Sequence, residues 1–162
     1  MSDEWYTPLW LLDAIGNDFD LDPCSPDGGL GHVVARERYT MRDDGLSKDW
    51  GGRYVFMNPP FGGRCGHLPW FHKFIKNGNG VGVANALTSS GWFHEITPQM
   101  GGVLFPKGKT KFEKPDGTTG KSPVNGVVLY AIGDRACAAL RESGVGIYLT
   151  IEQNPKGQFR LF

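Results

Sequence analysis

Arg53-Tyr54-Val55-Phe56-Met57, followed at once by Asn58-Pro59-Pro60-Phe61, is the stretch that decides the fold of this 162-residue chain. The first five residues end in a continuous apolar run, which is typical of a short buried strand. Each proline that follows fixes its own φ and lacks an N–H, so the chain has to leave the sheet there. The stretch therefore predicts a buried strand that ends in a rigid loop carrying an amide side chain and an aromatic ring.

This loop has the groups needed to hold a planar amino group. Asn58 offers a side-chain carbonyl, Pro59 a backbone carbonyl and Phe61 a flat apolar face. Two acceptors on the two N–H bonds of an amine would pull its nitrogen toward tetrahedral geometry and turn its lone pair toward an electrophile. No general base is required for such a reaction. An ordinary Asn-Pro turn is the alternative, since both residues are common where a loop begins.

The composition is that of a soluble globular protein. Apolar residues make up 40% and aromatic residues 12% of the chain, and no apolar run approaches the roughly 20 residues that a membrane-spanning helix needs. The N-terminus is acidic and polar, unlike a secretory signal. Three widely spaced cysteines, Cys24, Cys65 and Cys137, indicate reduced thiols. We therefore expect one compact domain over residues 1–151, a tail over residues 152–162, and a cytoplasmic location.

Strand and helix patterns alternate along the chain. Thr7 and Pro8 suit the N-cap and the first position of a helix that ends at Gly16. This alternation predicts an α/β sheet with helices on both faces. Ligands of such sheets lie outside the carboxyl ends of the strands, where both Asp22 and Asn58 fall. We expect further helices over residues 68–77, around Trp92, and over 134–141 with Asp134 as cap. We expect strands over residues 19–22, 53–57, 81–86, 103–106, 124–132 and 145–151. Residues 23–34 and 39–52 are expected to be irregular.

Three more motifs accompany these elements. Leu21-Asp22-Pro23-Cys24 places an acid at a strand end, and the glycines that follow it allow close approach of the backbone. Trp5-Tyr6-Thr7-Pro8 precedes the first expected helix. Asp43-Asp44-Gly45-Leu46 offers carboxylates that can accept hydrogen bonds, and Trp50 stands downstream as an anchor. Each motif also has an ordinary interpretation: a simple turn, a helix cap and a solvated turn, respectively.

In this order the motifs resemble those of the small phage and prophage DNA N-6-adenine-methyltransferases of the Dam type. That family's pattern runs Trp-x-Thr-Pro, Leu-Asp-Pro-Cys, Asp-Asp-Gly-Leu, Trp, Asn-Pro-Pro-Tyr/Phe, Trp-Phe-His and Lys-Phe. The chain is similar to it across roughly residues 4–131, including Trp92-Phe93-His94 and Lys111-Phe112. The resemblance implies a Rossmann-like methyltransferase fold, S-adenosylmethionine as methyl donor and adenine in DNA as acceptor. It also implies a phage-encoded enzyme that works in the host bacterial cytoplasm.

The resemblance further implies a role for particular residues. The catalytic loop would be Asn58, Pro59, Pro60 and Phe61, with the ring of Phe61 stacking on an adenine flipped out of the duplex. One departure stands out: in most enzymes of this methyltransferase class a Gly-x-Gly directly follows the acid, whereas here Gly28, Gly29 and Gly31 stand further along. The cofactor would be held by Trp5, Thr7, Pro8, Asp22, Pro23, Cys24, Asp44 and Leu46.

The charges are unevenly distributed although the net charge is zero. Residues 1–50 hold 11 acidic and 4 basic side chains, and residues 51–162 hold 6 acidic and 13 basic ones. The basic side chains include five lysines within residues 107–122, where only Glu113 and Asp116 are acidic. We expect this loop to contact DNA phosphates through Lys107, Lys109 and Lys111, with Arg64 beside the catalytic loop as a further contact. A solvated loop, in a fold that mixes both halves, is the alternative.

Two other functional classes remain open from the sequence. A methyltransferase acting on RNA adenine or protein glutamine uses a similar loop around a planar amino group. A nucleic-acid-binding relative without catalytic activity would keep the fold alone, and the unusual glycine spacing is compatible with it. Cys24, Cys65, His67 and His72 fit no standard zinc-ligand spacing, so we expect no metal. The sequence indicates neither the recognised DNA site nor the oligomeric state.

Overall fold

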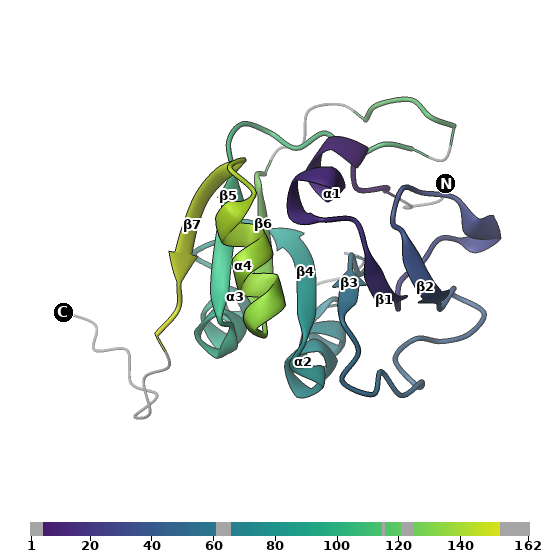
Figure 1. Cartoon of the computed structure of the whole chain (residues 1–162), viewed down its shortest axis with the longest axis horizontal. Helices are drawn as coiled ribbons and strands as arrows, with labels where there is room; N and C mark the ends of the chain where they lie inside the picture. The colour runs from purple at the N-terminus through teal and green to yellow at the C-terminus, as the bar shows by residue number, and fades with distance from the viewer. Residues whose placement is uncertain (1–4, 61–65, 115, 121–124, 153–162) are drawn as a thin grey trace.

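A computed structural model describes residues 5–60, 66–114, 116–120 and 125–152. They contain a seven-stranded sheet of order β2-β1-β3-β4-β6-β5-β7 (Figure 1). The first four strands along the chain are parallel, β6 runs antiparallel to β4 and β5, and β7 runs antiparallel to β5. The strands are β1 (Phe19–Asp22), β2 (Ala35–Arg38), β3 (Val55–Met57), β4 (Gly80–Asn85), β5 (Gly102–Pro106), β6 (Val127–Ile132) and β7 (Gly146–Thr150).

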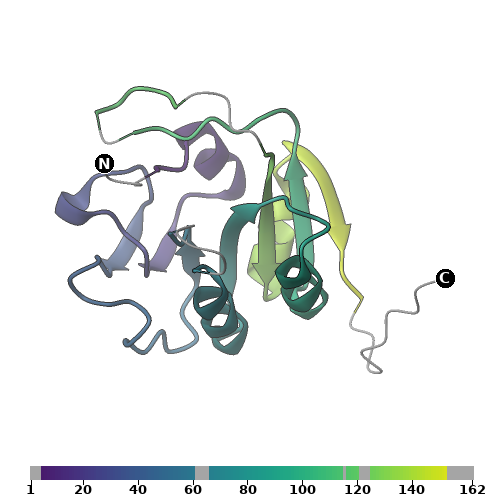
Figure 2. The same cartoon turned by 180° about the vertical axis from the view of Figure 1, so that it is seen from behind.

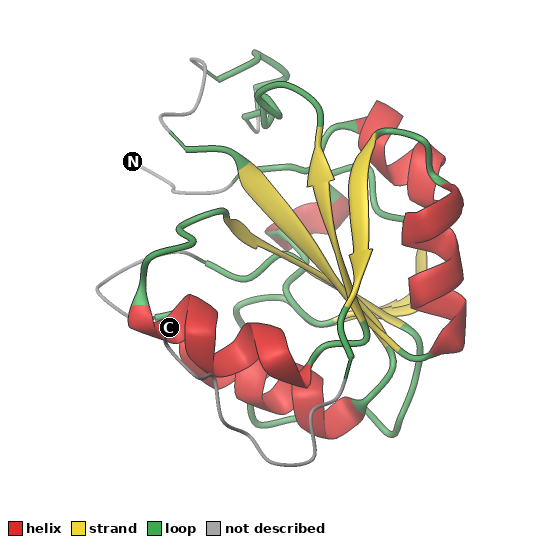
Figure 3. Cartoon of the chain, turned by 90° about the vertical axis from the view of Figure 1, so that its left-hand side faces the viewer, coloured by secondary structure: helices red, strands yellow, loops and turns green. Residues whose placement is uncertain are grey.

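Helices cover both faces of this sheet, as predicted (Figure 3). One face packs against α1 (Leu9–Ile15) and α4 (Asp134–Glu142), the helix in front of the sheet in Figure 1. The other face packs against α2 (Leu68–Asn77) and α3 (Gly91–Ile96), which lie in front in Figure 2. None of the helices in the described ranges has the length and apolar character needed to cross a membrane.

The short strand β3 is buried on both faces, which explains its uninterrupted apolar sequence. Val55 and Met57 belong to the core beneath α2 and α3, and Phe56 belongs to the core beneath α1 and α4. The strand is therefore held between two hydrophobic layers. The loop that follows it starts from a fixed position.

Strand β1 is irregular at its centre. The N–H groups of Asp20 and Leu21 both donate to the Tyr54 carbonyl, at 2.8 and 3.3 Å. Two residues thus face one, the arrangement of a β-bulge. Phe19 and Leu21 consequently point into opposite cores although they are two residues apart. The Asp20 carboxylate accepts the N–H of Tyr54 at 3.0 Å, and this bond together with Arg36 lowers the pKa of Asp20.

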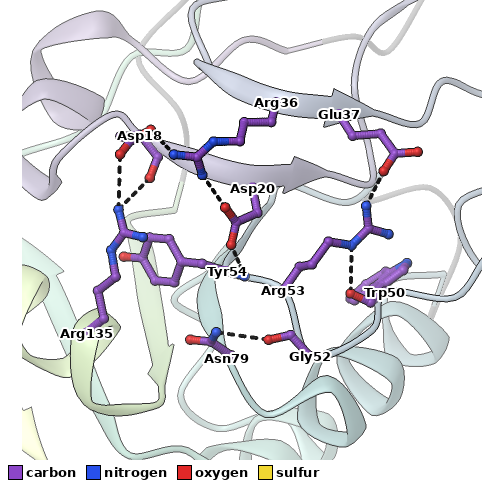
Figure 4. A network of polar contacts seen from close by, with 10 residues as sticks. All are labelled: Asp18, Asp20, Arg36, Glu37, Trp50, Gly52, Arg53, Tyr54, Asn79 and Arg135. Atoms are coloured by element: carbon purple, nitrogen blue, oxygen red, sulfur yellow. Dashed lines mark hydrogen bonds and ion pairs between the residues drawn. The ribbon is translucent and has the colours of Figure 1, made fainter.

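Ion pairs reinforce the edge of the sheet where β1 and β3 begin (Figure 4). Arg36 pairs with Asp20, and Arg135 donates to the carbonyl and carboxylate of Asp18 at 2.8 and 3.4 Å. The Arg135 guanidinium also lies 4.0 Å from the centre of the Tyr54 ring. The charged groups at this edge therefore have partners within the protein.

The structure departs from the expected elements in three places. Strand β2 was not expected, because its residues Ala35–Arg38 are mostly polar and none is fully buried, so it lacks an apolar signal. Pro8, not Thr7, is the N-cap of α1, and Thr7 makes no capping hydrogen bond there. Gly133, not Asp134, is the N-cap of α4. Residues 153–162, most of the expected tail, lie outside the described residues.

Gly80 faces Val55 across the central strands β3 and β4, and its replacement should be costly. Its φ of +147° favours glycine, and an added Cβ would lie 2.3 Å from the Val55 carbonyl oxygen. We expect Gly80→Ala to lower the free energy of unfolding by about 1–3 kcal/mol, as measured by urea denaturation. Gly91→Ala is the matched control, because a Cβ at Gly91 meets no atom within 4 Å. Equal midpoints for both variants and the wild type would contradict this packing.

Candidate active site

Asp22 and Asn58 lie at a topological switch point of the sheet. The two strands that carry them, β1 and β3, are neighbours and run parallel, with Leu21 opposite Val55. After β1 the chain continues to β2 on one side, and after β3 it continues through α2 to β4 on the other. The carboxyl ends of two such strands border the crevice in which open α/β sheets bind ligands. The topology thus brings the two predicted strand-end side chains to one edge.

Asn58 is held through one half of its side-chain amide. Its Nδ2 donates to the Trp5 carbonyl at 3.0 Å and approaches the Thr7 hydroxyl at 3.4 Å. A backbone carbonyl can only accept, so this contact requires the NH2 group to face Trp5. The Thr7 hydroxyl, expected to cap a helix, instead lies beside Asn58.

The other half of the amide has no partner within the described residues. The Oδ1 atom of Asn58 is buried and accepts no hydrogen bond there. A buried acceptor left without a donor costs about 1–3 kcal/mol, and buried polar groups of this kind are uncommon in folded proteins. The loop therefore presents an acceptor that an external N–H or O–H donor could satisfy.

The prolines after Asn58 differ in exposure. Pro59 is buried and Pro60 is exposed. Phe61 and Arg64 lie outside the described residues, so the stacking of Phe61 on a base and the phosphate contact of Arg64 stay predictions.

Asp22 is a buried acid with a pKa close to neutral pH. Its side chain is 4% exposed, and Oδ1 accepts the N–H of Cys24 at 3.1 Å. Burial raises the pKa of Asp22 to about 7, although the Cys24 N–H and the charge of Arg38 act in the opposite direction. Burial, and then the nearby Asp22, raise the pKa of the Cys24 thiol as well. Cys24 is therefore a neutral thiol rather than a nucleophile.

The Asp43–Leu46 turn packs directly on the loop after β1. An added Cβ at Gly45 would lie 2.2 Å from the Pro23 carbonyl oxygen, so only glycine fits this contact. The indole N–H of Trp50 donates to the Gly45 carbonyl at 2.9 Å and secures the turn. Asp44 is exposed with a φ of +51°, and Leu46 is half-buried. Two of the segments expected to hold the cofactor thus lie in contact.

The lysine-bearing loop between β5 and β6 folds back over the N-terminal segment (Figure 1). Glu113 forms an antiparallel bridge with Tyr6, with N–H···O distances of 2.8 and 3.0 Å. Its carboxylate also pairs with His32 at 2.6 Å. Within the loop, Glu113 faces Thr119 across a short hairpin. Lys107, Lys109, Lys111 and Lys114 are exposed.

The structure brings two groups of the predicted site residues into contact. It connects Trp5 and Thr7 to Asn58, and connects Pro23 to the Asp43–Leu46 turn. The bridge between Tyr6 and Glu113 was missed by sequence reasoning, since it links residues over a hundred positions apart through backbone atoms that carry no sequence signal. The contact of Gly45 was also missed, although a glycine between two acids and a leucine could have indicated a close approach.

Comparison with known proteins identifies relatives of the chain. The sequence model of the DNA N-6-adenine-methyltransferase (Dam) family matches residues 1–130. A protein of Haemophilus phage HP1 (strain HP1c1) named DNA N-6-adenine-methyltransferase is 30% identical over 100 residues, which make up 56% of this chain and 54% of that relative. The match thus spans about half the length of the curated relative. No solved structure matches the chain.

The buried acid should make stability depend on pH in a defined direction. The pKa of Asp22 is about 7 in the folded state, against about 3.9 when unfolded. The folded state therefore binds the extra proton between these values, and its stabilising effect is complete below about pH 4 and is lost as pH rises toward 7. We expect the unfolding free energy of the wild type, minus that of Asp22→Asn, to fall by roughly 1–4 kcal/mol from pH 4 to 7.

Asp43→Asn is the matched control in these denaturation measurements. Hydrogen bonds from the N–H and hydroxyl of Thr40 lower the pKa of Asp43. Its contribution is therefore present above the unfolded pKa and is lost as pH falls, opposite in sign to that of Asp22. A wild-type-minus-Asp22→Asn difference that stays constant or rises with pH would show that Asp22 is not a desolvated acid.

Proposed function

The chain belongs to the DNA N-6-adenine-methyltransferase (Dam) family, and on that premise we propose that it transfers a methyl group from S-adenosylmethionine to the exocyclic amino group of adenine in DNA. The observation that carries this proposal is the buried Oδ1 of Asn58, an acceptor without a donor among the described residues. The bacteriophage source of the relative favours a phage or prophage origin, and hence work in the host bacterial cytoplasm.

The topology supports a Rossmann-like methyltransferase fold. Four parallel strands with a switch point between β1 and β3 provide the type of crevice that binds nucleoside-containing cofactors. Asp22, at the end of β1, suits the positively charged amino group of the methionine part, because an ammonium partner would favour the ionised carboxylate. The Asp43–Leu46 turn, packed on Pro23, suits the ribose and adenine through Asp44 and Leu46. Trp5, Thr7, Pro8 and Cys24 would complete the surroundings of the cofactor.

Asn58 would act by orienting the adenine amine. Its Oδ1 accepts one N–H of the amine, and the Pro59 carbonyl accepts the other. The nitrogen would then become more tetrahedral, and its lone pair would be available to the methyl group that S-adenosylmethionine supplies. The N–C bond would form as the S–C bond breaks, with S-adenosylhomocysteine as leaving group and the amine proton released to water. Because the Asn58 NH2 group already donates to Trp5, the carbonyl is aligned before the base arrives. As positive charge develops on the amine, both acceptors stabilise it, and one such contact is worth about 3–4 kcal/mol.

The lysine loop would supply affinity for the DNA backbone. Exposed Lys107, Lys109 and Lys111 belong to a segment that is bridged to the residue next to Trp5. Phosphate contacts of this kind give binding that weakens with salt and that does not select sequence. Phe61 and Arg64 are proposed to add stacking on the flipped base and a further phosphate contact.

Replacement of Asn58 should abolish methyl transfer while leaving cofactor binding intact. We expect Asn58→Ala to lower tritiated methyl transfer to unmethylated DNA by about 100-fold or more, as found when one charge-stabilising contact is removed. Nucleoside analysis of the wild-type product should give methylated adenine and no methylated cytosine. The Kd for S-adenosylmethionine, measured calorimetrically, should change little.

Asn85→Ala is the control for that experiment, because Asn85 ends the neighbouring strand β4. It should retain nearly full activity. If the wild-type protein methylates RNA or a glutamine-containing peptide in preference to DNA, its substrate is RNA adenine or protein glutamine instead. Undetectable binding of S-adenosylmethionine would favour a nucleic-acid-binding relative without catalytic activity. An Asn58→Ala enzyme at the wild-type rate would refute the role of this residue.

Cofactor affinity should also depend on the charge of Asp22. If the cofactor amino group binds the ionised carboxylate, binding lowers the pKa of Asp22 from about 7 and releases a proton. We therefore expect the Kd for S-adenosylmethionine to rise as pH falls below 7. Calorimetry in buffers of different ionisation enthalpy should detect proton release near pH 6.5. An Asp22→Asn protein should lose this dependence, and an unchanged dependence would exclude Asp22 as the partner.

A further inference from the structure

Backbone and side-chain contacts form a continuous path from the lysine loop to Asn58. The loop hairpin is bridged to Tyr6 through two hydrogen bonds of Glu113, at 2.8 and 3.0 Å. The next residue toward the N-terminus, Trp5, accepts the Asn58 NH2 group at 3.0 Å. The residue that follows Tyr6, Thr7, lies 3.4 Å from the same nitrogen. Both groups that orient Asn58 therefore flank Tyr6, the residue that is bridged to the hairpin.

The hairpin also fixes the Trp5 side chain. Gly120 donates its N–H to the Phe112 carbonyl at 2.9 Å, which joins the two sides of the hairpin. An added Cβ at Gly120 would lie only 2.4 Å from Cζ3 of the Trp5 indole. The Trp5 indole thus lies directly on the backbone of the hairpin at Gly120. The Trp5 carbonyl accepts the hydrogen bond from Asn58.

A second contact ties the same hairpin to the loop after β1. Glu113 pairs with His32 at 2.6 Å, and both side chains are about one-third exposed (34% for His32, 30% for Glu113). His32 belongs to the segment between β1 and β2, and its carbonyl accepts the side chain of Asn17 at 2.7 Å. The hairpin is therefore joined to the loop that follows Asp22 as well as to the segment that orients Asn58.

From these contacts we infer that the hairpin formed by residues 112–114 and 116–120 positions Asn58, with Gly120 and Glu113 as positioning residues. This inference rests on the proposed function and deepens it. DNA phosphates that bind the exposed lysines of the loop would stabilise the hairpin against Tyr6. The Trp5 carbonyl would then hold the Asn58 amide with its Oδ1 toward the base. Contact with the DNA backbone and alignment of the catalytic acceptor are thus coupled, and by linkage the coupling acts in both directions.

The test compares Gly120→Ala with Gly126→Ala. Both positions lie in the connection between β5 and β6 and have no positive φ, but a Cβ at Gly126 meets no atom within 4 Å. Gly120→Ala should displace the Trp5 indole and lower kcat about tenfold or more. The loss should fall mainly on kcat rather than on the KM for a DNA duplex, and Gly126→Ala should match the wild type. A higher KM for DNA at unchanged kcat would overturn the inference, since it would assign the hairpin to DNA affinity alone.

A second readout does not depend on methyl transfer. The side-chain NH2 resonances of Asn58, identified by their absence in Asn58→Ala, should shift in Gly120→Ala and on addition of a DNA duplex, and should not shift in Gly126→Ala. Unshifted resonances overturn the coupling even if the enzyme is active. If the wild type proves inactive on DNA, the proposed function fails, whereas shifted resonances would still establish the link between hairpin and asparagine.

Glu113→Gln covers the case in which Gly120→Ala does not fold. It removes the charge that pairs with His32 without adding heavy atoms, and thermal unfolding shows whether the protein remains intact. We expect the same direction of change, a lower kcat and shifted Asn58 resonances. Wild-type kcat and resonances in a folded Glu113→Gln protein would exclude the Glu113 carboxylate and its pair with His32 from the positioning role.

Discussion

In the part of the chain that the structure describes, the Asn58 amide is held through its NH2 group alone, and the proposed site depends on this constraint. Its NH2 group donates to a carbonyl that cannot donate in return, and its Oδ1 is buried without a donor among the described residues. Three features impose this state: a strand buried on both faces, prolines that supply no N–H, and an N-terminal segment that lies across the strand end. The protein thereby keeps an acceptor desolvated and aligned, which is the condition for a strong interaction with an incoming amine.

The two ends of strands β1 and β3 differ in whether their polar side chains have partners within the protein. Where β1 and β3 begin, Asp18, Asp20 and their arginine partners are paired within the protein. Where the same strands end, Asp22 is a desolvated acid with a raised pKa, and Asn58 Oδ1 is buried without a donor among the described residues. The ion pairs at the first end contribute rigidity. Under the proposed function, the polar groups at the second end would gain partners when a ligand binds, as is expected where a functional site costs local stability.

Patterns of apolar residues, prolines and glycines were sufficient to predict the helices, most strands and the strand ends at which Asp22 and Asn58 lie. These patterns did not predict β2, because its mostly polar residues lack an apolar pattern. They also predicted Thr7 as a helix cap, whereas its hydroxyl contacts the Asn58 side chain. The pairing of Tyr6 with Glu113 uses backbone atoms, so the residue types at these positions do not predict it. Sequence thus locates individual strand ends, whereas the relation between distant segments requires the folded chain.

The most direct measurement is a crystal structure of the protein with an adenine-containing DNA duplex and S-adenosylhomocysteine. We expect the adenine amino nitrogen to lie about 2.7–3.2 Å from Asn58 Oδ1, a normal hydrogen bond, while Asn58 Nδ2 still donates to the Trp5 carbonyl. An adenine bound elsewhere, or an Asn58 amide turned so that its carbonyl is satisfied by the protein itself, would contradict this expectation.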